Sequence, residues 1–214
     1  MSSKRILFFL FFSFSLTSFG QHIIQDIAIE GLQKTKKQTI FKLLQTKIGS
    51  QLDSTTVTKD IVFIKRLALV SHSDFKVEFL KDNSCKIVIY IQENFTILPD
   101  INFWETIDNR FSYRLGVYDY NFLGRNITLG GFYQNNGFDS YGINFNAPFL
   151  FSNKWGIAIN HQNWKSEEPL FLNNQTANYL YNNISFEILG LYQLNLSNKF
   201  SFGINVFEEN YQFL

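Results

Sequence analysis

Cysteine, proline and charge are all scarce in this chain of 214 residues. The single cysteine, Cys85, excludes an intramolecular disulfide and cannot form a zinc site by cysteine spacing. Charged residues make up 17% of the chain and the net charge is +1, so the chain lacks the basic surface that neutralises nucleic-acid phosphates. The composition therefore predicts no nucleic-acid partner, and stability must come from packing or from a membrane.

Long apolar runs are also absent, except for one at the N-terminus. Lys4 and Arg5 precede an apolar run from Ile6 to Leu16, and residues 17–20 are small or neutral, which is the order of a secretory signal peptide. The run is only about half of the ~20 residues that a membrane-spanning helix needs. We therefore expect residues 1–20 to be a removed signal peptide, and any further membrane association to use strands.

No catalytic arrangement is visible in the sequence. His22, His72 and His161 are far apart and have no neighbouring cysteine or carboxylate pair at metal-ligand spacing. The glycines lack the order of a phosphate-binding loop, and there is no nucleophile elbow. The sequence predicts that the chain is not an enzyme and that it binds no metal and no cofactor.

Residues 21–94 mix two kinds of periodicity. Apolar residues alternate at 27–30, recur at helical spacing at 40–48 and again after Asp53, and alternate at 75–79 and 87–91. Gly49 is the expected C-cap of the first helix and Asp53 the N-cap of the second, and Asp82-Asn83 is the expected hairpin turn. The segment is predicted to be an α+β domain with the order β-α-α-β-β.

After residue 94 we expect a linker at 95–110, which contains Pro99, and then strands at 111–214, with the segment from Lys165 to Asn183 as a long connection between the fourth and fifth strands. Six segments alternate between large apolar residues and Gly, Asn, Gln or Ser. We expect these apolar residues to face lipid: Leu115, Val117, Ile127, Leu129, Ile143, Phe145, Ile157, Ile159, Phe186, Ile188, Phe202 and Ile204. An amide-rich second face with few charges favours the lumen of a transmembrane β-barrel over a soluble β-sandwich, which remains the alternative.

Six antiparallel strands are too few to close a barrel, whose smallest natural form has about eight. An open edge in lipid would leave backbone groups unpaired. The prediction is therefore an incomplete barrel, belonging to a fragment, a truncated copy or a split gene.

Several motifs resemble the BamA/TamA family of outer-membrane assembly and translocation proteins. In the first part the resemblance lies in Ile27 to Leu32, Ile48-Gly49, Phe75 to Val77 and Ile89 to Glu93. In the second part it lies in the turn after the first strand and in a turn after the third, at Asp119, Asn121, Phe122, Gly124 and Pro148. The resemblance implies one periplasmic POTRA domain followed by the first strands of a barrel of the 16-stranded type in the bacterial outer membrane.

The same resemblance implies a function in the assembly or translocation of outer-membrane proteins. An edge strand of the POTRA domain would capture unfolded client chains by β-augmentation, through Phe75, Lys76, Val77, Glu78, Phe79 and Leu80. The implied partners are outer-membrane lipid, unfolded outer-membrane proteins and other subunits of an assembly machinery. Two alternatives remain: a membrane-anchoring or secretion-pore barrel for an enzyme or passenger, and a soluble secreted β-rich binding module.

Overall fold

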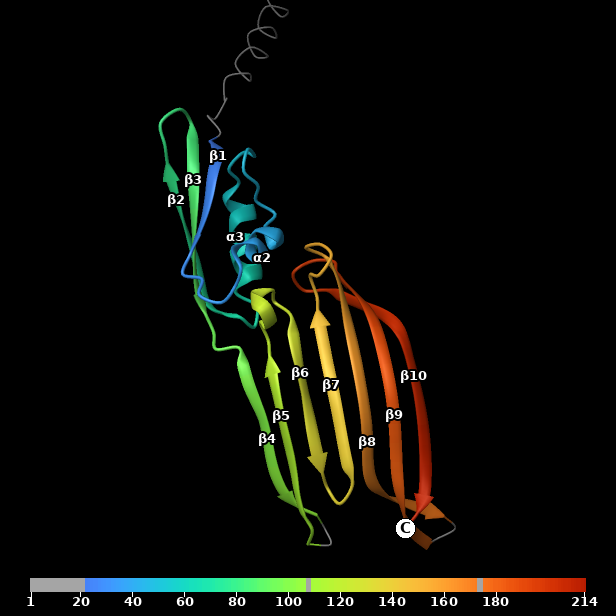
Figure 1. Ribbon diagram of the computed structural model, residues 1–214. Helices are drawn as coiled ribbons and strands as arrows, with labels where there is room; N and C mark the ends of the chain where they lie inside the picture. Colours follow the sequence, from blue (N-terminus) through green and yellow to red (C-terminus); the bar gives the residue numbers. More distant parts are fainter. Residues whose placement is uncertain (1–21, 107–108, 173–174) are drawn as a thin grey trace, which may run out of the picture.

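The computed structural model describes residues 22–106, 109–172 and 175–214, and shows an α+β unit followed by a large antiparallel sheet (Figure 1). The predicted signal peptide at 1–20 lies outside the described residues. Within the described residues, no helix is both long enough and apolar enough to cross a membrane.

The α+β unit has the element order that the sequence predicts. It consists of β1 (Ile23–Glu30), α2 (Lys37–Leu43), α3 (Ser54–Ile64), β2 (Val70–Phe79) and β3 (Ser84–Glu93). The strand order is β1-β3-β2, with β1 parallel and β2 antiparallel to β3. The two helices cover one face of this sheet (Figure 1).

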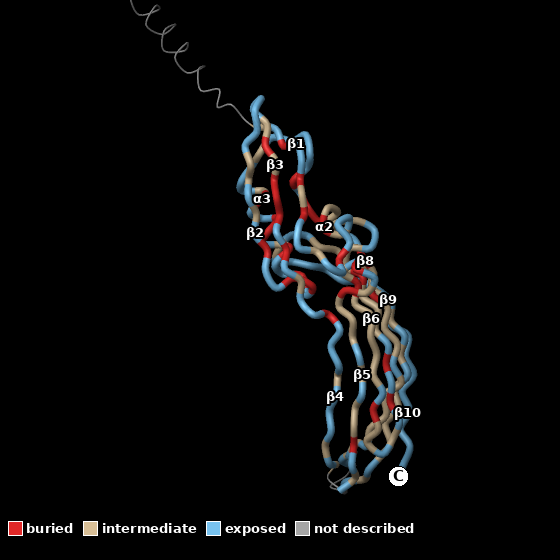
Figure 2. The backbone as a smooth tube through the Cα atoms, turned by 60° about the vertical axis from the view of Figure 1, so that its left-hand side comes forward, coloured by how far each residue is buried: buried red, intermediate tan, exposed pale blue. Residues whose placement is uncertain are grey.

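One apolar core holds the unit together. It contains Ile24, Ile27, Ile29, Ile40, Leu43, Leu44, Val57, Ile61, Ile64, Leu67, Leu69, Val70, Cys85, Ile87, Ile89 and Ile91. In Figure 2 the buried segments are concentrated in this unit and where it meets the large sheet. The free thiol of Cys85 belongs to this core, and burial raises its pKa. The core is assembled from one face of the sheet and the apolar stripes of both helices, as a two-layer fold requires.

Turn and cap chemistry fixes the ends of the elements. Asp53 is the N-cap of α3, as predicted, and its carboxylate accepts hydrogen bonds from the Thr55 amide and the Thr56 hydroxyl. Asp82 and Asn83 both have positive φ and turn the β2–β3 hairpin, also as predicted. Gly49, however, is not a helix C-cap: α2 ends at Leu43, and the Gly49 amide donates to the Ile24 carbonyl of β1.

Asp60 joins α3 to the segment that follows α2. It is 2% exposed, and its two carboxylate oxygens accept the amides of Gln45 and Thr46, each at 2.9 Å. Replacing Asp60 with alanine is expected to destabilise the α+β unit by about 3 kcal/mol, because two amides would lose a charged acceptor in a buried place. Proteolysis of the full chain in increasing urea, read at cleavage sites within 22–94, would measure the loss. An unchanged urea midpoint would contradict this role for Asp60.

The large sheet is a seven-stranded antiparallel meander. Its strands are β4 (Ile97–Glu105), β5 (Phe111–Asp119), β6 (Thr128–Asn135), β7 (Asp139–Ala147), β8 (Trp155–Leu172), β9 (Gln175–Gln193) and β10 (Lys199–Phe213), with the 3-10 turn η1 (Phe122–Gly124) between β5 and β6. Neighbours in sequence are neighbours in the sheet, and β4 and β10 are its edges. The sheet is open and has the form of part of a barrel (Figure 1).

Two sequence-based expectations for this part are wrong. Residues 97–105, predicted to be part of a linker at 95–110, form β4, so the sheet has seven strands instead of about six. Pro99 is tolerated because β4 is an edge strand that pairs only with β5. The segment from Lys165 to Asn183, predicted as a connection between strands, largely extends β8 and β9, which pair from Trp155 with Tyr192 to Leu172 with Gln175.

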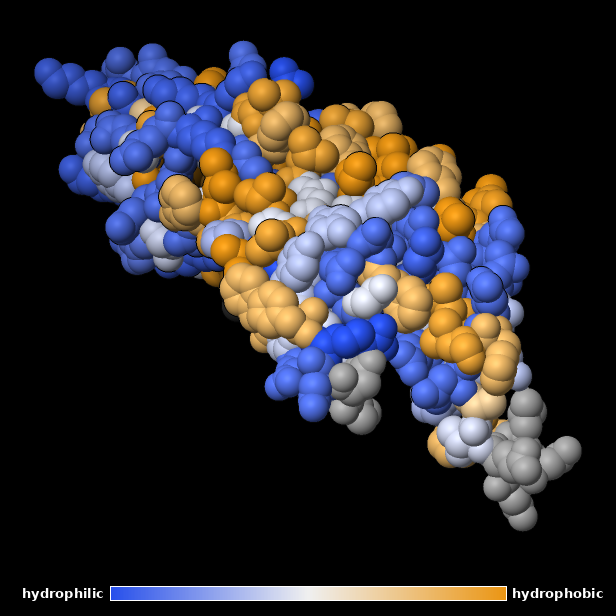
Figure 3. Space-filling view, turned by 60° about the horizontal axis from the view of Figure 1, so that its bottom comes forward, coloured by the Kyte–Doolittle hydropathy of each residue, from blue (hydrophilic) through white to orange (hydrophobic). Residues whose placement is uncertain are grey.

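The two faces of the large sheet differ. Cross-strand pairs such as Leu129 with Phe145 and Ile159 with Ile188 place large apolar residues on one face, here called the apolar face. The alternating residues form the polar face, which carries Asn, Gln, Ser, Gly and a few charged groups together with aromatic rings. Figure 3 shows apolar side chains gathered over the sheet, whereas the α+β unit is mostly hydrophilic.

Candidate functional site

The turn between β5 and β6 joins the large sheet to the α+β unit. Asp119 ends β5, and both of its carboxylate oxygens accept the Lys34 ammonium at 2.9 Å. The Thr96 hydroxyl donates to the same carboxylate at 3.0 Å, as does the Asn121 amide within the turn. Asp119 therefore fixes the shape of its own turn and binds the loop that precedes α2.

Asn121 provides a second, fully buried link, and is 1% exposed. Its side-chain nitrogen donates to the Thr35 hydroxyl at 2.8 Å, and its side-chain oxygen accepts the Asn126 amide at 2.9 Å. One end of the amide contacts the α+β unit and the other closes the turn. A carboxylate at this position would lack the donor to Thr35, which explains why asparagine fits here.

Gly124 allows a close backbone approach at the junction, the contact between this turn and the loop before α2. Its φ is +70°, and a Cβ atom here would lie 2.2 Å from the Lys34 carbonyl oxygen. Its carbonyl accepts the Lys36 amide and the Thr39 hydroxyl, both at 2.9 Å. Only glycine combines this conformation with this contact. Phe122, the remaining residue of the turn motif, begins η1 and is half-buried, and its amide donates to the Ile127 carbonyl.

Glu93, the last residue of β3, supports the junction from the side of the α+β unit. Its two oxygens accept the amides of Lys34 and Thr35 at 2.9 and 2.8 Å. Burial by itself would raise the pKa of Glu93, but hydrogen bonds from Thr35 and from the backbone of residues 33–35 outweigh it and hold the pKa below its ordinary value. The carboxylate thus stays ionised at neutral pH and orders the Lys34 loop.

A second contact forms around the turn that contains Pro148. The Phe149 ring packs edge-on against Phe63 of α3, with centroids 5.5 Å apart. The Lys42 ammonium donates to the carbonyls of Phe149 and Leu150 at 2.6 and 2.7 Å. The Arg66 side chain likewise donates to the Leu196 carbonyl in the β9–β10 turn. Three turns of the large sheet therefore contact the α+β unit.

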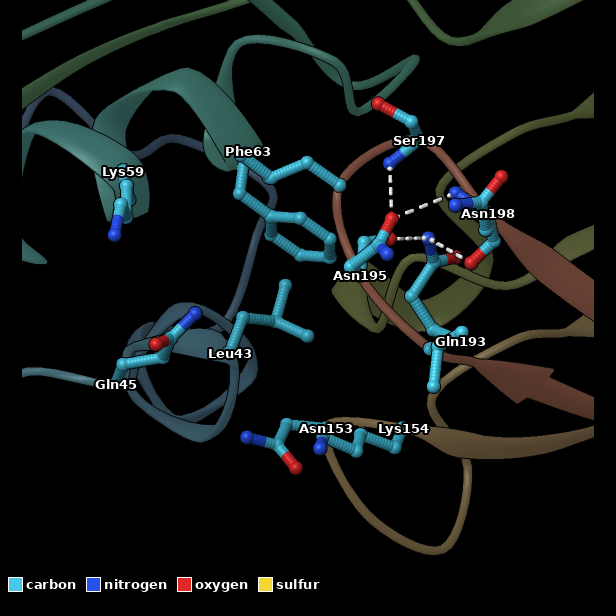
Figure 4. A pocket seen from close by; sticks show the side chains of 12 residues that line it. Leu43, Gln45, Lys59, Phe63, Asn153, Lys154, Gln193, Asn195, Ser197 and Asn198 are labelled. Atoms are coloured by element: carbon cyan, nitrogen blue, oxygen red, sulfur yellow. Dashed lines mark hydrogen bonds between the residues drawn. The ribbon is translucent and has the colours of Figure 1, made fainter.

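A cleft of about 740 Å³ lies between the helices and two of these turns (Figure 4). Leu43, Gln45, Lys59 and Phe63 line it from the helices, and residues 153–154 and 193–198 line it from the turns. Figure 4 shows a polar wall on the side of Asn195 and Asn198, with hydrogen bonds inside the β9–β10 turn. The cleft separates the α+β unit from the sheet beside the fixed junction.

Polar side chains bond to one another across strands on the polar face. Arg114 donates to Asp100 at 2.8 Å, and its guanidinium lies 3.7 Å from the Phe132 ring centroid. Further along, Asn144 donates to Asn160, which donates to Glu187 at 2.7 Å. Phe132, Asn144, Asn160 and Glu187 are among the residues that line a cavity of about 300 Å³. Such satisfied cross-strand networks are what the interior of a polar barrel requires.

The structure brings together eleven of the twelve residues that the sequence predicts to face lipid. By strand register these lie on the apolar face: Leu115, Val117, Leu129, Ile143, Phe145, Ile157, Ile159, Phe186, Ile188, Phe202 and Ile204. Ile127 is the exception. It precedes β6, is 7% exposed and lines a pocket with α2, so the expectation that it faces lipid is wrong.

The predicted client edge is an edge of the small sheet. Phe75, Lys76, Val77, Glu78 and Phe79 are in β2, which begins earlier than predicted, at Val70, and Leu80 follows the strand. Phe75 and Val77 pack against the core, whereas Phe79 is 63% exposed and contacts the His22 ring. Lys76 and Glu78 form an ion pair on the opposite face, at 3.2 Å.

Sequence reasoning missed Lys34, Thr35 and Glu93 as junction residues. Nothing local marks them, because Lys34 and Asp119 are 85 positions apart. The turn motif of Asp119, Asn121, Phe122 and Gly124 is the only part of the junction with a visible sequence signal. Among the residues that the structure describes, no group of three or more His, Cys, Asp or Glu could hold a metal ion.

No protein-family model matches the chain, and no curated protein matches it in sequence. Solved structures do match. BamA from Haemophilus ducreyi lacking POTRA domains 1–3 has a TM-score of 0.62 at 16% identity, over 89% of this chain and 36% of that one. CdiB from Acinetobacter baumannii matches at 0.57 and 11% over 90% of this chain, and CdiB from Escherichia coli at 0.60 and 9% over 89%.

Each CdiB match covers 38% of the known protein, so the chain spans little more than a third of the length of the structures that it resembles. The identities are low, and the likeness is therefore one of fold. The fold of this chain is that of part of the BamA and CdiB barrel structures.

Proposed function

We propose that the chain is an outer-membrane component that assembles or translocates client proteins, with the strands of its large sheet in the bilayer and a POTRA-type α+β unit in the periplasm. The observation that carries the proposal is a sheet with one apolar and one polar face, held to an α+β unit by a buried junction. Its likeness in fold to BamA and CdiB supports the assignment.

The height of the apolar face supports placement in a bilayer. Along β9, apolar residues on this face run from Tyr192 to Ile184, and Asn182 follows. On β10 the apolar residues run from Phe200 to Val206, and Glu208 follows. The band is nine residues long on β9 (184–192) and seven on β10 (200–206), close to the 9–11 that a tilted strand needs to cross the hydrocarbon core. Trp155 and Tyr192, with ring centroids 4.5 Å apart, lie at its end near the α+β unit, where an aromatic girdle is expected.

The extent of the structural matches supports the POTRA assignment. Residues 97–213 of the large sheet make up little more than half of the chain, yet the matches cover 89–90% of it. The matched region must therefore extend over the α+β unit.

The far ends of β8 and β9 reach beyond the apolar band on the side away from this unit, in keeping with the longer extracellular side of outer-membrane barrels.

The edge geometry of the small sheet favours β2 as the client-binding strand. The other edge, β1, is covered at its start, because Ile24 exchanges backbone hydrogen bonds with Gly49 and Ser50, and the Leu52 amide donates to His22. On β2, the Leu80 amide donates to the Ser84 carbonyl at the start of the ladder. Antiparallel alternation then turns the amides of Val77 and Phe79 away from β3, toward a strand that could be added. The Phe75 amide also points away from β3, where it donates to the Asp74 carboxylate at 2.8 Å.

Replacing Val77 with proline is expected to weaken client binding about fivefold or more, because it removes an outward amide of the kind worth roughly 1 kcal/mol. The probe is a synthetic amphipathic strand with the sequence of residues 184–193, titrated against the full chain in detergent by fluorescence anisotropy. Val77→Ala keeps the amide and loses the same packing, so it is the matched control. Equal affinities for the proline and alanine variants would exclude β-augmentation at this edge.

Cell fractionation tests the membrane placement directly. The full chain, expressed in a Gram-negative host, is expected to sediment with outer membranes, to resist extraction by urea, and to float with lipid in a density gradient. Recovery from the periplasm without detergent would contradict the proposal and favour a soluble secreted module.

A further inference from the structure

A small basic pocket lies where α2 meets the end of the apolar face. It has a volume of about 220 Å³ and is lined by Lys36, Gln38, Thr39, Lys42, Arg125, Ile127, Ala147, Phe149 and Leu150. We call it the rim pocket. Its lining contains three cations and no acid.

Little compensates the positive charge of the rim pocket. The side chains of Lys36 and Arg125 are exposed and form no ion pair with any described residue, and the Lys42 ammonium is met by two carbonyl oxygens and no carboxylate. Partial burial lowers the pKa of Lys42. An anion in the pocket would be attracted by all three cations, and it would give the half-buried Lys42 the anionic partner that no described carboxylate supplies.

The floor of the rim pocket continues the apolar face. Ala147 pairs with Ile157 and follows Phe145 by two positions, so strand alternation places it on that face. Ile127, which precedes β6 and is buried, lines the pocket beside it together with residues of α2. Leu150, which lines the pocket, is 40% exposed, and its neighbour in the sequence, Phe151, is 67% exposed. Cations thus stand directly above an apolar surface at the edge of the predicted membrane band.

We propose that the rim pocket binds the phosphate of an anionic phospholipid headgroup from the periplasmic leaflet, with Lys36 and Arg125 contacting the phosphate and the acyl chains lying on the apolar face. This inference rests on the proposed membrane placement. Free phosphate would share the charge complementarity but would gain nothing from the exposed apolar rim, which is the reason for assigning a lipid. The volume suits a phosphate with its glycerol attachment, not a large ligand.

Native mass spectrometry of the full chain in detergent tests the proposal. With added phosphatidylglycerol, the wild type is expected to retain one lipid that phosphatidylcholine does not replace. The double variant Lys36→Gln/Arg125→Gln is expected to lower the apparent affinity about tenfold or more, since each basic residue near an anionic lipid surface contributes several-fold. Inorganic phosphate at millimolar concentration is not expected to displace the lipid.

The matched control is Lys59→Gln/Lys154→Gln, which removes the same charge from the 740 Å³ cleft and shares no residue with the rim pocket. Equal loss in both double variants, equal retention of the two lipids, or displacement by inorganic phosphate would overturn the lipid assignment. The urea-resistant membrane fraction, measured on the same variants, separates the two proposals. If the wild type fails to enter membranes, the proposed function is contradicted. If it inserts normally but binds no lipid selectively, only the lipid site is contradicted.

Discussion

Replacing Ile143 with arginine is expected to abolish stable membrane insertion of the chain. Ile143 is 57% exposed near the middle of the apolar face, where it pairs with Gly131 and His161 on the neighbouring strands. An arginine facing lipid near the bilayer midplane costs about 2–4 kcal/mol. In a water-soluble sheet the same exposed substitution would change stability by no more than about 0.5 kcal/mol. The fraction of chain that floats with lipid vesicles would measure the effect.

Gln162→Arg is the matched control for this experiment. Gln162 pairs with Gly142, one register step from Ile143, but lies exposed on the polar face. A charge there would be solvated in the lumen, so insertion should remain close to that of the wild type. Normal flotation of Ile143→Arg would show that the apolar face does not contact lipid. That result would contradict the proposed membrane placement.

The two faces of the large sheet could be predicted because strand alternation is a local property. Residues two positions apart share a face in any strand, so Ile157 and Ile159 could be grouped without knowing the neighbouring strand. β4 was missed because Pro99 interrupts a short segment, and proline normally argues against a strand. Its tolerance depends on β4 being an edge, which is a fact of topology that the local sequence does not contain.

Ile127 shows the limit of the same reasoning. It has the parity of Leu129, yet α2 covers it, and that helix is supplied by a part of the chain about 90 positions earlier. The same limit applies to the junction between the α+β unit and the large sheet. The turn from Asp119 to Gly124 could be recognised from its residues, but its partners Lys34 and Thr35 could not, because only the folded chain brings them together.

Gly124→Ala is expected to open the junction between the α+β unit and the sheet. The new Cβ would lie 2.2 Å from the Lys34 carbonyl oxygen, which is backbone and cannot rotate away. The two hydrogen bonds to the Gly124 carbonyl would lengthen or break, and alanine would be strained at a φ of +70°. Together these effects cost about 3 kcal/mol. Hydrogen–deuterium exchange of residues 33–39 should become at least tenfold faster, because the Lys36 amide loses its acceptor.

Gly49→Ala is the control that distinguishes backbone strain at a positive φ from a steric clash of the new Cβ atom. Gly49 has a φ of +85° and lies in the same α+β unit, but a Cβ atom there would meet nothing within 4 Å. It should lower stability by the conformational cost of about 1 kcal/mol and leave exchange at residues 33–39 unchanged. Position 124 is not on the apolar face, so the Gly124→Ala variant should insert into membranes as the wild type does. Faster exchange in both variants would mean that general destabilisation, and not the contact between Gly124 and Lys34, controls the junction.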